Sequence, residues 1–157
     1  MDHQHKHRES SASAYWSLAV QVIASGIIMY LTMFVMIDNL GSFYNNLNML
    51  YMTLMMVAPM VVLMIAGMRH MFASRAVNTT LFAACLIIFF GSFALIRSQT
   101  TIGDTAFLRS MIPHHSGAIL MCREARLSNP EIIRLCKSIE RSQRQEIDQM
   151  KEILSRR

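Results

Sequence analysis

The chain has 157 residues, of which 53% are hydrophobic and only 16% charged, and its formal net charge is +5 at pH 7. The excess basic residues are concentrated near the carboxy terminus and interleaved with acids, which indicates a solvated face and not a nucleic-acid surface. The three cysteines show no CxxC or zinc-type spacing. The long uncharged stretches lack the polar face of a soluble helix and favour a membrane protein.

The first thirteen residues form a polar stretch in which His3, His5 and His7 alternate with Gln and Lys. We expect this tail (1–13) to be disordered. His-rich tracts bind Cu(II), Ni(II) or Zn(II), so the tail is a weak metal-capture site or simply a solvated extension.

Three stretches without Asp, Glu, Lys or Arg follow, at 10–37, 39–68 and 76–96. Because about 20 apolar residues cross a bilayer, they predict transmembrane helices at about 14–37, 47–68 and 77–97, within a membrane region spanning 14–97. The first stretch is too long for the apolar part of a signal peptide and is expected to stay in the membrane.

The basic residues of the loops predict the orientation. Lys6 and Arg8 precede the first span, and Arg69 and Arg75 lie between the second and third, whereas the first loop has neither residue type. Positive loops stay in the cytoplasm. The amino terminus is therefore expected in the cytoplasm of a bacterium, with the inner membrane spanned three times and the segment after Arg97 on the periplasmic side.

The second predicted span carries a stripe of methionines at intervals of four residues. Such a stripe winds slowly around one side of a helix. It is either a thioether ladder for Cu(I) transport or a lipid-compatible packing surface. The stripe comprises Met52, Met56, Met60, Met64 and Met68.

The segment 101–157 is predicted to form a helical hairpin. Its first helix runs from Asp104, as the cap, to Leu127, and its second begins with Asn129 as N-cap and Pro130 in the first turn. The second helix ends near Leu154, and its apolar stripe is too extensive for one partner. A second copy of the hairpin would complete a four-helix bundle by oligomerisation.

The hairpin contains neighbouring donor atoms suited to copper. Met111 lies within one helical turn of His114 and His115. Folding the hairpin about residue 129 brings Gln143 and Glu146 opposite the two histidines and Met150 near Met111. Thioethers and imidazoles favour Cu(I). The two histidines point about 100° apart, so a shared ion is not expected unless Pro113 distorts the turn. The alternative is that the methionines only fill the core.

Two cysteines lie on the same hairpin, Cys122 on its first helix and Cys136 on its second. They would be bridged if the helices face each other there, and otherwise free or metal ligands. The spacing alone does not choose between these states.

This segment resembles the DUF305 family of ferritin-like helical-bundle proteins, which are often periplasmic or membrane-attached, with some members implicated in copper binding and resistance. By resemblance, the metal ligands are Met111, His114, His115 and Met121, with Glu146 and Met150 as partners. The chain has a single hairpin where many relatives have two, which favours dimerisation. The residues that carry the resemblance are Asp104, Phe107, Leu108, Met111, Ile112, Pro113, His114, His115, Gly117, Ala118, Met121, Gln143, Glu146, Ile147 and Met150.

The sequence therefore predicts an all-α protein that anchors a copper-binding hairpin to a membrane, for copper tolerance, sequestration or delivery. Delivery would require a periplasmic copper carrier as partner. The alternatives are a structural membrane oligomer without a metal, or a Cu(I) channel built on the methionine stripe. No enzyme is expected, because the chain lacks a nucleophile–base pair, a phosphate-binding loop and the Glu-x-x-His of di-iron oxidases.

Overall fold

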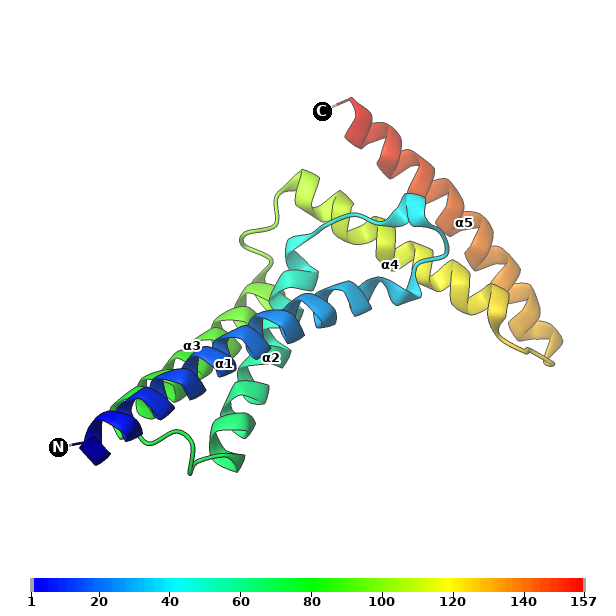
Figure 1. Cartoon of the computed structure of the whole chain (residues 1–157). Coiled ribbons are helices and arrows are strands. Elements are labelled where there is room, and N and C mark those ends of the chain that lie inside the picture. The colour runs from blue at the N-terminus through cyan, green and yellow to red at the C-terminus, as the bar shows by residue number, and fades with distance from the viewer. Residues whose placement is uncertain (1, 157) are drawn as a thin grey trace. The chain divides into compact units, whose positions relative to one another are not determined.

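The computed structural model describes the backbone of residues 2–156 and the side chains of residues 13–156. Within residues 2–156 the secondary structure is entirely helical, which confirms the predicted class (Figure 1). The helices are α1 (Asp2–Thr32), the 3-10 turns η1 (Met33–Met36) and η2 (Leu40–Ser42), α2 (Leu47–Gly67), α3 (Arg75–Ser98), α4 (Asp104–Glu124) and α5 (Pro130–Ser155).

The chain divides into two compact units. The membrane unit contains the chain up to Tyr30 and Leu50–Gln99, and the hairpin unit contains Leu31–Met49 and the chain from Thr100 onward. The connection between the first two spans therefore packs with the carboxy-terminal hairpin. The expected domain boundary at residue 101 leaves this connection out.

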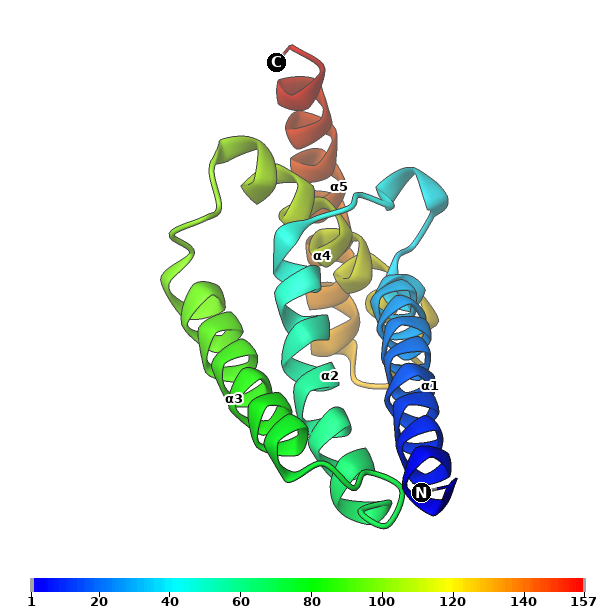
Figure 2. The ribbon, with the colours of Figure 1, turned by 60° about the vertical axis from the view of Figure 1, so that its left-hand side comes forward.

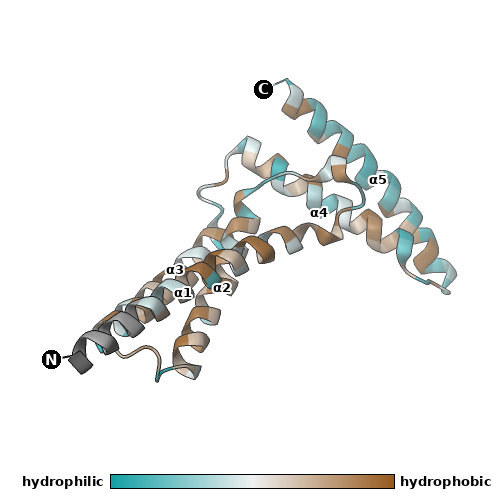
Figure 3. Ribbon diagram, viewed as in Figure 1, coloured by the Kyte–Doolittle hydropathy of each residue, from teal (hydrophilic) through white to brown (hydrophobic). Residues whose placement is uncertain are grey.

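Three helical segments are long and apolar enough to cross a bilayer, namely Ser13–Met36, Leu47–Gly67 and Arg75–Ser98. Their hydrophobic residues are apparent in Figure 3. They match the expected spans closely, because hydropathy and length define the expected and the observed segments alike.

Helix α1 begins at Asp2, so the amino-terminal stretch expected to be disordered is helical. The side chains of His3, His5 and His7 lie outside those that the structure describes.

The membrane unit packs around small and branched side chains of α1, α2 and α3 and around Phe72 of the connection between α2 and α3. Figure 2 shows the ribbons of the three helices apart from one another. The Tyr15 hydroxyl donates to Asn78 Oδ1 at 2.8 Å, and Asn78 Nδ2 donates to the Phe72 carbonyl at 2.9 Å. These bonds tie the start of the first span to the connection between the other two. Trp16 is 74% exposed, as expected for an aromatic anchor at a membrane interface.

In the hairpin unit, α4 and α5 run antiparallel. His115 contacts Glu146 and Cys122 contacts Cys136, so positions that advance along α4 meet positions that recede along α5. Their shared core comprises Leu108, Ile112, Ile119, Ile147 and Met150.

The ends of the hairpin helices confirm one predicted cap and correct another. Asn129 accepts from the Glu131 N–H at 2.8 Å, and Pro130 begins α5, as expected. The N-cap of α4 is Gly103, and Asp104 is instead its first residue, where a carboxylate favours the helix dipole. Helix α4 ends at Glu124 and not at Leu127, because the chain turns back through an extended Ala125 to reach the next cap.

Candidate functional site

His115 is a buried polar residue of α4 that contacts α5. Its side chain is only 10% exposed. Nδ1 lies 2.9 Å from the Met111 carbonyl oxygen, and Nε2 lies 2.6 Å from Glu146 Oε2. A carbonyl oxygen can only accept, so Nδ1 carries the proton of that bond. The backbone of α4 thereby fixes the ring with Nε2 directed at α5.

Glu146 gives this contact access to solvent, because its side chain is 49% exposed. With a proton on Nε2, His115 and Glu146 form an ion pair between the two helices. Without that proton, Nε2 offers the one lone pair of the ring available to a ligand. Nε2 of His115 is thus the ring nitrogen at which a metal cation can take the place of the proton.

Two methionines flank the pair. Met150, one turn from Glu146, is buried in the hairpin core, and Met111, one turn from His115, packs against the same cluster. The structure therefore brings four predicted ligands into one region of the α4–α5 contact: Met111, His115, Glu146 and Met150.

The remaining predicted ligands of the hairpin lie apart from this group. His114 is exposed, with its ring centroid 6.0 Å from that of His115, and Met121 is 54% exposed. Adjacent helical positions diverge, as the sequence indicated. Among the described residues, no group of three or more His, Cys, Asp or Glu side chains could hold a metal ion. A metal at His115 would therefore need the thioethers as ligands.

The methionine stripe of α2 lies in two environments. Met52 and Met56 are 42% and 36% exposed, Met60 is half-buried, and Met64 and Met68 pack against the core of the membrane unit. Two apolar cavities of this unit, of about 400 and 370 Å³, are lined by other side chains. Transport along the stripe stays a prediction.

Cys122 and Cys136 form a disulfide with their Cα atoms 5.2 Å apart. Of the three states left open by the sequence, the structure has the bridged one. The bond joins the end of α4 to the beginning of α5, next to the connecting loop. Cys85 is free and buried within α3.

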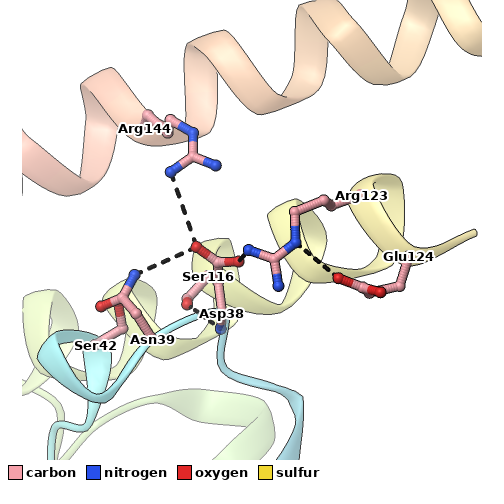
Figure 4. Close-up of polar contacts among 7 residues, drawn as sticks. All are labelled: Asp38, Asn39, Ser42, Ser116, Arg123, Glu124 and Arg144. Carbon is pink, nitrogen blue, oxygen red and sulfur yellow. Dashed lines mark hydrogen bonds and ion pairs between the residues drawn. The ribbon is translucent and has the colours of Figure 1, made fainter.

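A second polar cluster, which the sequence analysis missed, surrounds Asp38 (Figure 4). The Asp38 side chain is 5% exposed and forms ion pairs with Arg123 of α4 and, at 3.8 Å, with Arg144 of α5. The Asp38 N–H also donates to the hydroxyl of Ser116, a fully buried residue, at 2.7 Å. One aspartate thus links the 31–49 segment to both helices of the hairpin.

The charges of this cluster reinforce one another. The pKa of Arg123 is raised by its hydrogen bond to Glu124 and, next, by the negative charge of Asp38. Asp38 is the only acidic residue between Glu9 and Asp104. A solitary carboxylate between two membrane spans requires a partner, and this signal could have identified the cluster from the sequence.

Comparisons with known proteins agree with the hairpin motif. The family described as "Domain of unknown function (DUF305)" matches residues 93–154. An uncharacterized protein of Acanthamoeba polyphaga mimivirus is 38% identical over 144 residues, which cover 89% of this chain and 92% of the relative. That similarity extends well beyond the hairpin into the membrane unit. No solved structure matches. The chain belongs to the DUF305 family.

Proposed function

We propose that this protein is a membrane-anchored copper-binding protein whose hairpin holds Cu(I) at His115. The observation that supports this most is the orientation of the ring. Nδ1 donates to the Met111 carbonyl, and Nε2 is directed toward the facing helix. Metal-binding histidines are usually fixed in this way, with one nitrogen held by a carbonyl or carboxylate and the other left for the metal.

The donor atoms around His115 fit Cu(I) better than Zn(II). Met111 and Met150 would supply thioethers, which zinc scarcely uses and Cu(I) prefers. When the metal binds, the carboxylate of Glu146 would move away from His115 Nε2. It would then either bind the metal weakly or accept a hydrogen bond beside it. Bound copper would join α4 to α5 at the place where the His115–Glu146 contact now joins them.

We place the hairpin outside the cytoplasm, on the periplasmic side of a bacterial inner membrane. The disulfide between Cys122 and Cys136 supports this side, because such bonds persist in oxidising compartments and are rare in the cytosol. The positions of Arg69 and Arg75 in the loop between the last two spans support the same orientation.

We also propose that two copies associate through their hairpins. Phe107, Ile132 and Leu135 are 50%, 46% and 58% exposed on α4 and α5. A second hairpin covering them would complete a four-helix bundle. Such an assembly suits copper tolerance by sequestration, or delivery to a periplasmic carrier.

Titration of the purified full-length protein with Cu(I) tests the proposal. Met111→Leu and Met150→Leu remove sulfur while nearly conserving volume and apolarity. Each should weaken Cu(I) binding about tenfold with little change in thermal stability. Met121→Leu is the matched control, because Met121 is exposed and outside the cluster.

Ascorbate is the suitable reductant for this titration, since it maintains Cu(I) and leaves the disulfide intact. If all three methionine variants bind Cu(I) like the wild type, the methionines are packing residues and the proposed site is wrong. If Met121→Leu alone weakens binding, copper binds elsewhere on the hairpin.

A further inference from the structure

A polar cavity of about 450 Å³ lies in the hairpin unit, between the beginning of α4, the end of α5 and the 31–49 segment. Its volume is within the range of small-molecule sites. The lining residues are Tyr44, Thr105, Arg109, Lys151, Leu154 and Ser155. None of them belongs to the proposed copper site.

The charged side chains of this lining are both cations. Among the described residues, neither Arg109 nor Lys151 has a hydrogen-bond or ion-pair partner, whereas Arg123, Arg144 and Arg156 are all paired with acids. Lys151 is half-buried, and its Nζ lies 3.7 Å from the position that a Cβ on Gly41, in η2, would take. Two unpaired positive charges in one cavity attract an anion.

The hydroxyl groups add directed donors. Ser155 Oγ already donates to the Glu152 carbonyl at 2.8 Å, so it can only accept from a ligand. The hydroxyls of Tyr44 and Thr105 have no such bond among the described residues and can donate. Asp104, the nearest acid along the chain to Thr105, lines a different cavity.

We propose that this cavity binds a phosphate group. The guanidinium of Arg109 and the ammonium of Lys151 would pair with its oxygens, and the hydroxyls of Tyr44 and Thr105 would donate to them. Charge-assisted bonds of this kind are the strong ones, and a guanidinium matches the geometry of phosphate.

The chain itself favours a lipid headgroup as the source of the phosphate. Tyr44 lies three residues before the first residue of α2, so extended chain separates them by at most about 11 Å. Thr105 follows the end of α3 at Ser98 by one short connection. Short stretches of chain thus connect the lining residues to the ends of two spans, and the ends of spans are the parts of the chain nearest to phospholipid phosphates. Free phosphate is the other source of the same chemistry.

Binding to the full-length protein in non-ionic detergent tests this proposal with two probes. Phosphatidylglycerol is measured by native mass spectrometry, and inorganic phosphate by calorimetry. The cavity variant Arg109→Gln/Lys151→Gln is compared with Arg126→Gln/Lys137→Gln, which removes the same charge from exposed residues outside the cavity. The cavity variant should bind at least about tenfold more weakly, and the control should bind like the wild type.

If the cavity variant loses binding of phosphatidylglycerol and the control variant does not, the result supports a lipid headgroup as the ligand. If the same difference is found with inorganic phosphate, the result supports free phosphate as the ligand. Equal losses in both double variants, or no binding of either probe by the wild type, would overturn the proposal. Tyr44→Phe keeps the ring that packs against the hairpin core and removes one donor. It should weaken binding severalfold even if the double cavity variant does not fold.

Discussion

A single carboxylate, that of Asp38, joins the 31–49 segment to both helices of the hairpin. The Asp38 side chain is nearly buried, while the guanidinium groups of Arg123 and Arg144 are half-exposed. The arginines therefore keep part of their hydration. Breaking the ion pairs costs most at Asp38, because its buried negative charge would be left without a partner. The backbone N–H of the same residue donates to Ser116, so side chain and main chain fix one position together.

Asp38→Asn tests this arrangement. The amide fills the same space but removes the negative charge, so the free energy of unfolding should fall by about 1–2 kcal/mol, after allowance for the exposure of the arginines. Denaturant unfolding of the full-length protein measures the change. Asp148→Asn, at an exposed position of α5, should change stability little. Equal stability of the two variants would show that the cluster contributes nothing.

At the scale of elements, the sequence predicted what depends on local pattern. Hydropathy located the three spans, the Asn129–Pro130 pair marked the start of α5, and folding about residue 129 correctly placed Glu146 opposite His115. It did not predict the docking of 31–49, because that segment has no periodicity and its partners lie far along the chain. Nor could spacing decide the state of the cysteines, which depends on how α4 and α5 meet.

The disulfide gives the hairpin a measurable share of its stability. It closes a loop with a sequence separation of 14 between Cys122 and Cys136. The loss of unfolded-state entropy for a loop of this length stabilises the native state by about 3 kcal/mol. Dithiothreitol should lower the unfolding midpoint of the wild type and leave Cys122→Ser/Cys136→Ser unchanged. A wild-type midpoint that does not respond to reductant would contradict the bond.

At the scale of the whole molecule, orientation decides whether the hairpin meets extracytoplasmic copper. Alkaline phosphatase, which is active only outside the cytoplasm, should be active when fused after Arg157 and inactive when fused after Met71, between the second and third spans. The reverse pattern would place the hairpin in the cytoplasm, where its disulfide would not persist.

His115 is the central ligand of the proposed copper site, and its neighbour His114 provides the control. His115 is buried and directed at Glu146, whereas His114 is exposed on the same helix. Cu(I) affinity of the full-length protein should fall at least about tenfold in His115→Ala and stay close to the wild-type value in His114→Ala. Unchanged affinity in His115→Ala, or an equal loss in both variants, would contradict a copper site between α4 and α5.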